Sequence, residues 1–331
     1  MIPAVVSTPA RPLVSVVFSF RNEAENLPVL VSRLATMFAA EPVDYELLFV
    51  NDASSDASIE VLTGLRAANP RVKIVNMSRR FGVAECARAG MSYARGDAVV
   101  YMDTDLQDPP EVIPQLLKAW RQGAEIVHTV RTRREGENKL KTWLVGRAYR
   151  LIRFGATIEL PVEAGDFKLL SRRAVDHLLT LRESDPYLRG LVVWLGFTQA
   201  QVPYVRSGRH GGRTHFPFFS RNPWKTAIVG LTSFSFGPIY ACGTLALIGL
   251  IASLLLIGAT AWLGLQGNPD AHHLGVIGLV TFFWATLLGA ISLVGLYVVR
   301  IYKDVRGRPQ YIVASTVGVE EKLVSTSGVD R

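Results

Sequence analysis

Charged residues are almost absent from one long stretch near the end of the chain. Between Lys225 and Arg300 the only formally charged residue is Asp270, which leaves uncharged runs of 44 residues (226–269) and 29 residues (271–299). A helix of about 20 apolar residues crosses the hydrocarbon core of a bilayer. The stretch therefore predicts two membrane-spanning helices, at about 239–265 and 274–299. Two buried helices of a soluble core are excluded, because nothing else in the chain is large enough to cover them.

Positive charges flank the two predicted spans on one side only. The flanking cations are Arg221, Lys225, Arg300, Lys303, Arg306 and Arg308, whereas the connecting loop 266–273 has no Lys or Arg. The positive-inside rule then predicts that both termini face the cytosol. Residues 1–12 lack the basic and apolar regions of a signal peptide. We expect a multi-pass protein of the inner (cytoplasmic) membrane whose N-terminal domain is cytosolic.

Residues 1–222 have the composition of a soluble domain and alternate between two patterns. Apolar strand patterns occur at 14–20, 45–50, 72–76, 98–102 and 124–130, and helical patterns at 25–39, 58–68, 83–94 and about 109–122. This alternation predicts an α/β domain with a mostly parallel sheet covered by helices on both faces. Ligands of such domains bind outside the carboxyl ends of the strands.

Composition and missing motifs exclude several functional classes. Two cysteines do not make a disulfide scaffold. No G-x-G-x-x-G follows the first strand and no G-x-x-x-x-G-K-[ST] occurs, which argues against dinucleotide dehydrogenases and P-loop NTPases. No nucleic-acid-binding motif is present either. We therefore attribute the net charge of +8 to contact with anionic lipid headgroups and phosphate substrates.

Acidic residues follow the fourth predicted strand. Asp103 and Asp105 are two residues apart, so both carboxylates leave the sheet on the same side of the chain. Two such carboxylates repel each other unless a cation lies between them, and Mg²⁺ or Mn²⁺ with oxygen ligands is the usual one. Two nearby acids have simpler interpretations: Asp108 is expected to cap the following helix, and Asp56 the helix at 58–68.

Four ordered motifs identify a family resemblance. Residues 20–23 (Phe-Arg-Asn-Glu), 50–56, 103–109 (Asp-Thr-Asp-Leu-Gln-Asp-Pro) and 165–172 (Gly-Asp-Phe-Lys-Leu-Leu-Ser-Arg) resemble the motifs of family 2 glycosyltransferases with the GT-A fold. With two C-terminal spans, the chain is similar to the polyprenyl-phosphate glycosyltransferases, which include dolichyl-phosphate mannose synthases and bacterial undecaprenyl-phosphate glucosyltransferases. The resemblance covers about 14–313 and implies a Rossmann-like GT-A catalytic domain plus a C-terminal two-helix transmembrane hairpin.

The resemblance also implies roles for individual residues. It assigns Phe20, Asn22, Glu23, Asp52 and Asp103 to the nucleotide sugar, Asp105 and Gln107 to the metal, Asp166 and Asp105 to catalysis, and Arg131, Arg209 and Arg213 to phosphate groups. For Asp166, proton abstraction and orientation of the acceptor both stay open, because a phosphate monoester is already largely a dianion at neutral pH. The element at 209–216 departs from the family pattern, since His215 replaces a lysine, whose charge Arg213 would supply.

Further segments have membrane or assembly interpretations. Residues 223–237 form an amphipathic pattern that predicts a helix in the membrane interface. Residues 139–155 have a basic amphipathic pattern that fits either an interfacial helix or an ordinary helix packed on the domain. The tail 303–331 is expected in the cytosol, and its segment 306–313 is a candidate strand for pairing with a neighbouring protomer in a homo-oligomer.

Taken together with the resemblance, these features imply an enzyme that moves a hexose to a polyprenyl phosphate on the cytosolic membrane face, with inversion. The best expectation is glucose from UDP-glucose and undecaprenyl phosphate as acceptor. Donors such as GDP-mannose or a UDP-aminosugar stay open, as does a scaffold with a degenerate GT-A domain. A processive synthase is disfavoured because the Q-x-x-R-W element and additional spans are missing.

Overall fold

The structure is a computed structural model that describes residues 11–133, 164–206, 237–267 and 271–319. The chain divides into two compact units. The first comprises 1–146, 160–220 and 309–331, and the second comprises 147–159 and 221–308.

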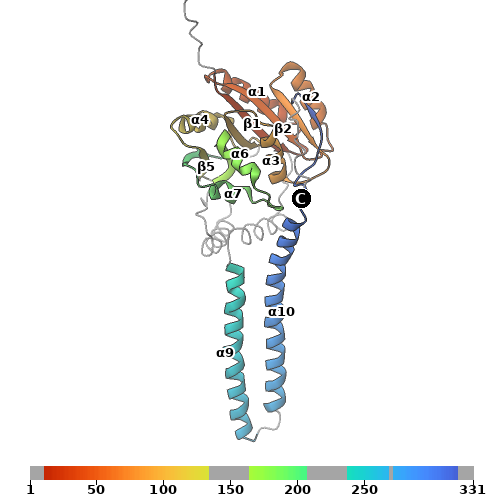
Figure 1. Cartoon of the computed structure of the whole chain (residues 1–331), viewed down its shortest axis with the longest axis vertical. Coiled ribbons are helices and arrows are strands. Elements are labelled where there is room, and N and C mark those ends of the chain that lie inside the picture. The colour runs from red at the N-terminus through yellow and green to blue at the C-terminus, as the bar shows by residue number, and fades with distance from the viewer. Residues whose placement is uncertain (1–10, 134–163, 207–236, 268–270, 320–331) are drawn as a thin grey trace, which may run out of the picture. The chain divides into compact units, whose positions relative to one another are not determined.

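The first unit is built on an eight-stranded sheet with the order β7-β5-β6-β4-β1-β2-β3-β8 (Figure 1). Its strands are β1 (Leu13–Phe20), β2 (Asp44–Asn51), β3 (Val72–Met77), β4 (Ala98–Asp103), β5 (Ile126–Arg133), β6 (Ala164–Ser171), β7 (Gln199–Val205) and β8 (Val313–Val317). Its helices are α1 (Asn26–Ala39), α2 (Ser58–Ala68), α3 (Val83–Tyr93), the 3₁₀ turn η1 (Pro110–Val112), α4 (Ile113–Arg121), α6 (Arg172–Thr180) and α7 (Leu188–Trp194).

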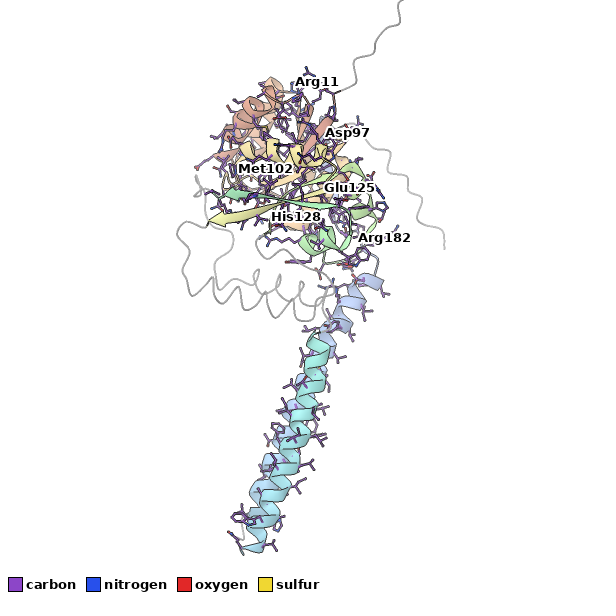
Figure 2. The ribbon with its side chains drawn as sticks, turned by 90° about the vertical axis from the view of Figure 1, so that its left-hand side faces the viewer. Arg11, Asp97, Met102, Glu125, His128 and Arg182 are labelled. Atoms are coloured by element: carbon purple, nitrogen blue, oxygen red, sulfur yellow. The ribbon has the colours of Figure 1, made fainter. Side chains whose placement is uncertain are left out.

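The central strands β4, β1, β2 and β3 run parallel to one another. They read as continuous apolar runs because helices cover both of their faces, as is usual for parallel sheets. The amino ends of β1 and β4 are joined where Leu13 donates its backbone N–H to Asp97 Oδ2 at 2.9 Å; Asp97 lies just before β4 (Figure 2). All four strands therefore deliver their carboxyl ends to the opposite edge of the sheet.

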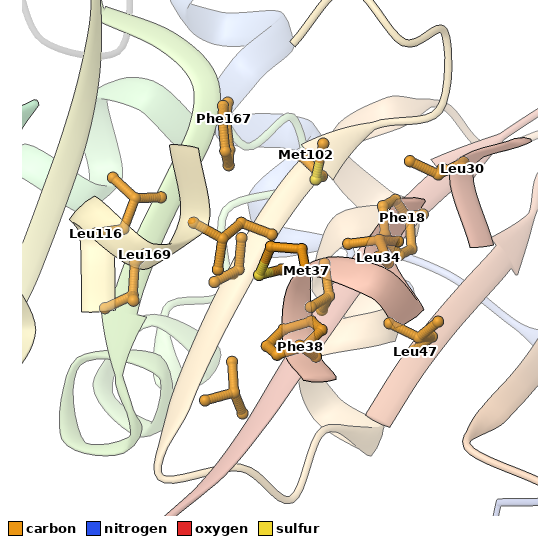
Figure 3. Packing of buried hydrophobic residues seen from close by; sticks show 14 of the residues in the cluster. Phe18, Leu30, Leu34, Met37, Phe38, Leu47, Met102, Leu116, Phe167 and Leu169 are labelled. Carbon is orange, nitrogen blue, oxygen red and sulfur yellow. The ribbon is translucent and has the colours of Figure 1, made fainter. Parts of the chain in front are cut away.

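Hydrophobic packing holds the helices on the sheet. On one face Phe18 stacks on Phe49 with ring centroids 4.6 Å apart, and Leu30 and Leu34 of α1 join the same buried cluster (Figure 3). On the other face Gly90 of α3 lies so close to β1 that a Cβ there would meet the Val17 side chain at 2.3 Å. A larger side chain at position 90 would push α3 off the sheet.

The predicted α/β class is confirmed. The five strands that we expected are also present, in the same order along the chain. The predicted helix at 58–68 has the bounds of α2, and the helix expected at about 109–122 begins as the 3₁₀ turn η1. The sequence patterns did not reveal β6, which lies antiparallel between β4 and β5. They also missed β7, which pairs with β5 in parallel.

Strand β8, near the end of the chain, pairs with the sheet of its own chain. We expected a strand at 306–313 that pairs with another protomer; the strand instead lies at Val313–Val317 and pairs antiparallel with β3 of the same chain. Asn76 of β3 donates to Ser315 Oγ at 3.1 Å, and Tyr311 donates to Ser92 Oγ at 3.0 Å. The pairing covers the otherwise open edge of β3. Homo-oligomer formation stays a prediction.

The second unit contains two long helices, α9 (Gly237–Leu265) and α10 (Ala271–Val305), which lie side by side. Their apolar segments, Cys242–Leu265 and Gly275–Val305, have mean hydropathies of 2.3 and 2.1. At most 6% of the apolar window in either helix is buried, so these are not core helices of a soluble protein. Their exposed apolar faces fit a lipid environment.

The predicted spans at about 239–265 and 274–299 fall within α9 and α10, and α10 extends six residues further. The predicted interfacial helices lie outside the described residues: all of 139–155, and 223–237 except its last residue.

Candidate active site

Strained backbone marks the carboxyl ends of three adjacent strands. Among the described residues, the only non-glycine residues with positive φ are Asn22 (57°), Ala53 (54°) and Leu106 (59°), which follow β1, β2 and β4. Each such residue costs about 1 to 3 kcal/mol and persists only where its surroundings hold it. All three are predicted site residues or direct neighbours of one, so the strain coincides with the predicted site.

Hydrogen bonds join the loops after β1 and β2. The Asn22 backbone N–H donates to Ser54 Oγ at 3.1 Å, and Asn22 Oδ1 accepts from the Ser55 backbone N–H at 2.8 Å. Glu23 Oε2 accepts from Asn26 Nδ2 at 2.6 Å, which fixes its carboxylate at the start of α1. The structure thus brings together Asn22, Glu23 and the loop after Asp52, as the nucleotide assignment requires.

The structure places the side chain of Phe20, one of the predicted nucleotide residues, in the hydrophobic core. Its side chain is only 4% exposed and packs edge-on against Phe49, with ring centroids 6.3 Å apart. The ring belongs to the hydrophobic core because β1 points it toward α1. Its backbone carbonyl accepts the Asp52 N–H at 3.0 Å.

Asp52 is buried and connects two elements. Its Oδ1 accepts from the backbone N–H groups of Phe81 at 2.7 Å and Gly82 at 3.3 Å, at the start of α3. Asp56 accepts from the N–H of Ser58, the first residue of α2, at 3.1 Å, but Ala57 occupies the N-cap position, so Asp56 lies one residue before the expected cap.

Asp103 and Asp105 flank the turn that follows β4. Asp105 is 8% exposed, and its Oδ1 accepts from the Gln107 backbone N–H at 3.2 Å. The left-handed conformation of Leu106 makes this tight turn. The turn therefore places the predicted metal ligands Asp105 and Gln107 next to each other.

Asp166 enters the site from β6. Tyr101 of β4 pairs with Lys168 of β6, and Asp103 and Asp166 each lie two residues beyond this pair, close enough for the charge of Asp166 to raise the pKa of Asp103. The sequence alone gave no way to see this, because 62 residues separate the two acids along the chain. The predicted catalytic carboxylate and the predicted nucleotide-side carboxylate are neighbours across two strands.

The two opposed acids differ in their electrostatics. Burial, together with the charges of Asp166, Asp108 and Asp105, raises the pKa of Asp103 to about 8. Burial would also raise the pKa of Asp166, but Arg189, Lys168 and Arg131 outweigh it and hold this pKa well below its usual range. Asp166 is therefore ionised at neutral pH, while Asp103 lies in an excess of negative charge.

That excess of negative charge fits a divalent cation. Among the described residues no group of three or more His, Cys, Asp or Glu side chains is arranged as a complete metal centre. However, Mg²⁺ and Mn²⁺ are commonly held by one or two carboxylates while substrate phosphates supply the remaining oxygens. Asp105 and Gln107 offer the oxygen donors that such an ion prefers, and the charges of neighbouring acids add to the effect of burial in raising the pKa of Asp103 beside them.

Asp108 was wrongly expected to be a helix cap. Pro109 occupies the N-cap position of η1. Asp108 is instead fully buried, with its Oδ1 accepting from the Tyr204 hydroxyl at 2.5 Å and lying 3.3 Å from Arg206 Nε. Arg131 Nε donates to the same Tyr204 hydroxyl at 3.1 Å. Asp108 thus orients the predicted phosphate ligand Arg131 through Tyr204.

Sequence reasoning missed several of these residues because they lie on β6, on α7, on β7 or directly after β7. No sequence motif contains Tyr204, Arg206 or Arg189. The only signal that could have located any of them is the alternation of apolar residues that indicates strand β7. Lys168 lies inside a recognised motif but received no role. It is 1% exposed, and burial lowers its pKa to about 8 despite the charge of Asp166.

His128 of β5, labelled in Figure 2, pairs with Lys168 of β6 in the sheet. Burial and the charge of Lys168 lower the pKa of His128 to about 4, so the ring is neutral at physiological pH. Its Nε2 lies 2.9 Å from Gln199 Oε1. His128 therefore adds no positive charge to the site. The predicted phosphate ligands Arg209 and Arg213 lie outside the described residues.

Comparison with known sequences gives a family match. The family described as glycosyl transferase family 2 matches residues 15–179. An uncharacterized glycosyltransferase of Bacillus subtilis (strain 168) is 37% identical over 93% of this chain and 95% of its own length. A bactoprenol glucosyl transferase of Shigella phage SfII is 32% identical over 91% of this chain and 97% of its own length.

Solved structures give more distant matches. Glucosyl-3-phosphoglycerate synthase from Mycobacterium tuberculosis, in complex with Mn²⁺, UDP-glucose and phosphoglyceric acid, is 20% identical with a TM-score of 0.47. The match covers 67% of this chain and 80% of that one.

Proposed function

We propose that this chain, which belongs to glycosyl transferase family 2, transfers glucose from UDP-glucose to a polyprenyl phosphate such as undecaprenyl phosphate. The chain is a glycosyltransferase by family. The observation that carries the choice of substrates is the similarity to bactoprenol glucosyl transferases, which extends over the membrane helices as well as the catalytic domain. The acidic and basic side chains that lie together at the strand ends also support this choice of substrates.

The reaction brings together two anions, the diphosphate of the donor and the phosphate of the acceptor. Their repulsion must be offset by cations in the site. Asp105 and Gln107 would hold a divalent ion, either Mg²⁺ or Mn²⁺, which stabilises the charge that develops on the leaving nucleoside diphosphate. Arg131, oriented by Tyr204 and Asp108, would bind a phosphate group in the fork geometry that arginine provides.

Asp166 acts in this proposal by orientation and charge. The acceptor is a phosphate monoester with a second pKa near 6, so it needs little help to lose its proton. The low pKa of Asp166 also makes it a weak base, because a carboxylate with a depressed pKa holds a proton poorly. We infer that Asp166 orients groups around the acceptor and that the attack inverts the anomeric centre.

The proposed acceptor requires the catalytic domain to lie at the cytosolic face of the membrane. The absence of Lys and Arg from the loop 266–273, with cations on the other side of both spans, supports this topology.

Cysteine introduced by Asn268→Cys is expected to react with a membrane-impermeant maleimide added to intact cells. Cysteine introduced by Ser327→Cys is expected to react only after permeabilisation. The parent protein with its native Cys86 and Cys242 is the control, and the reverse labelling would contradict a cytosolic active site.

A donor panel tests the reaction itself. Purified protein, undecaprenyl phosphate and Mn²⁺ are incubated separately with radiolabelled UDP-glucose, GDP-mannose and a UDP-aminosugar, and the lipid phase is counted. Label is expected in the lipid with UDP-glucose alone. Transfer from GDP-mannose or the aminosugar would replace the proposed donor while keeping the acceptor. Absence of lipid-linked label with every donor would reject the acceptor.

A further inference from the structure

Asp166 is held by an arginine that no motif of the sequence identifies. Arg189 Nε donates to Asp166 Oδ1 at 2.8 Å, and Arg189 Nη2 donates to Asp166 Oδ2 at 2.6 Å. This is the bidentate arrangement in which two parallel hydrogen bonds fix the plane of a carboxylate. A lysine would supply the same charge without fixing that orientation.

Asp166 needs such a partner because of where β6 places it. Asp166 and Asp103 each lie two residues beyond the paired Tyr101 and Lys168 of the neighbouring strands β4 and β6, so their carboxylates leave the same edge of the sheet. Repulsion between the two acids would otherwise rotate the Asp166 side chain away or leave it protonated. The charge of Arg189 removes that tendency and keeps Asp166 ionised in one orientation.

The support of Arg189 is itself rigid. Arg189 is the second residue of α7, whose Leu188, Leu191 and Val192 are buried. Hydrogen bonds from Arg88 of α3 hold the start of the segment before α7. The Arg88 side chain is 3% exposed. It donates to the carbonyls of Leu178, Leu179 and Leu181 at 3.1, 3.3 and 2.6 Å.

The segment before α7 is also fastened in its middle. Gln310, which precedes β8, donates to the carbonyl of Glu183. Buried contacts and hydrogen bonds from two distant parts of the chain therefore set the position of Arg189.

We propose that Arg189 is a positioning residue for the transfer reaction and acts through Asp166. This inference rests on the proposed function, because it gives Asp166 a part in transfer. Arg189 directs two of its donor nitrogens, Nε and Nη2, at the two oxygens of Asp166, so the role that this geometry supports is to orient that carboxylate. Arg131 keeps the phosphate role.

A double-mutant cycle tests the proposal with Arg189→Met, Asp166→Asn and the combined variant. Arg189→Met is expected to lower kcat by about 10- to 100-fold, because small misplacements of a group that orients the reactants are this costly. The KM values for the sugar nucleotide and the lipid should change little. In the Asp166→Asn background the same change should cost almost nothing, since its target is already lost. Arg189→Lys should recover part of kcat.

Arg182→Met is the matched control. Arg182 lies seven residues earlier, is exposed and is visible in Figure 2, so this variant should keep the wild-type kcat. Thermal unfolding of every variant separates a folding defect from a positioning defect. If Arg189→Met does not fold, Arg189→Lys takes its place in the cycle.

Mn²⁺ binding gives a second readout that does not depend on turnover. Without Arg189, Asp166 keeps only Lys168 and Arg131 as opposing charges, so Arg189→Met should tighten Mn²⁺ binding by about 10-fold, the equivalent of one pK unit. The Asp166→Asn background should abolish this gain.

If wild-type protein binds Mn²⁺ and shows this coupling but transfers no glucose, the proposed function fails while the Arg189–Asp166 pairing stands. Additive losses of kcat, a raised lipid KM with unchanged kcat, or equal Mn²⁺ affinity in all four proteins would overturn the proposal.

Discussion

Asp105→Ala is expected to lower kcat by about 10²- to 10³-fold, the loss typical when one charge-stabilising group is removed from an active site. The carboxylate lies at the strained turn after β4, where it accepts a hydrogen bond from the Gln107 backbone. Its loss removes a charged ligand of the proposed divalent ion. Membrane insertion should be unchanged, because α9 and α10 belong to a separate unit of the chain. Initial rates at saturating UDP-glucose and lipid, with and without Mn²⁺, provide the measurement.

The control for this variant is at the other end of the same strand. Asp97 precedes β4 and accepts a single hydrogen bond from Leu13 at the amino edge of the sheet. Asp97→Ala should keep the wild-type kcat. Wild-type protein should lose activity in EDTA and regain it with added Mn²⁺. Full activity of Asp105→Ala in saturating EDTA would remove the metal assignment.

Asp166→Asn is expected to lower the rate by about 10²-fold, and the ratio to the wild-type rate should stay constant above pH 7. Asparagine keeps the shape of the side chain but removes the charge that faces Arg189. Because the pKa of Asp166 is held well below its usual range, the carboxylate is ionised across the accessible pH range and gives the wild type no acidic limb of its own. Any limb near pH 6 belongs to the acceptor phosphate and should appear in both proteins.

The pH profile of kcat from pH 5.5 to 9 separates the two roles of Asp166. An obligatory base would give the wild type an acidic limb that Asp166→Asn loses together with nearly all activity, a loss of about 10²- to 10⁴-fold. Asp176→Asn is the control, because Asp176 is a 63% exposed side chain on α6 that forms an ion pair with Arg172 of the same helix. A wild-type rate for Asp166→Asn at every pH would leave Asp166 with neither role.

The sequence alone was enough for the parts of this protein that depend on local pattern. The two long apolar helices α9 and α10 follow from long uncharged runs, because a segment that is to cross hydrocarbon cannot carry charges without a large cost. The parallel strands β1 to β4 and helices α1 to α3 follow from buried apolar runs alternating with amphipathic ones, and their bounds agree within two residues. The acidic residues after the strands could be expected at one edge because parallel strands share their direction.

The tertiary structure decided every feature that depends on pairing between distant segments. Nothing local shows that β6 runs antiparallel beside β4, yet that register sets Asp166 against Asp103. Three further contacts join residues that are far apart in the chain. Tyr204 donates to the buried Asp108, Arg189 donates to Asp166, and β8 pairs with β3. Local propensity carries no information about such contacts, because their free energy arises only when the sheet assembles and excludes water from the charges. The charge states of Asp103 and Asp166 are therefore properties of the fold, although the sequence names the residues that carry them.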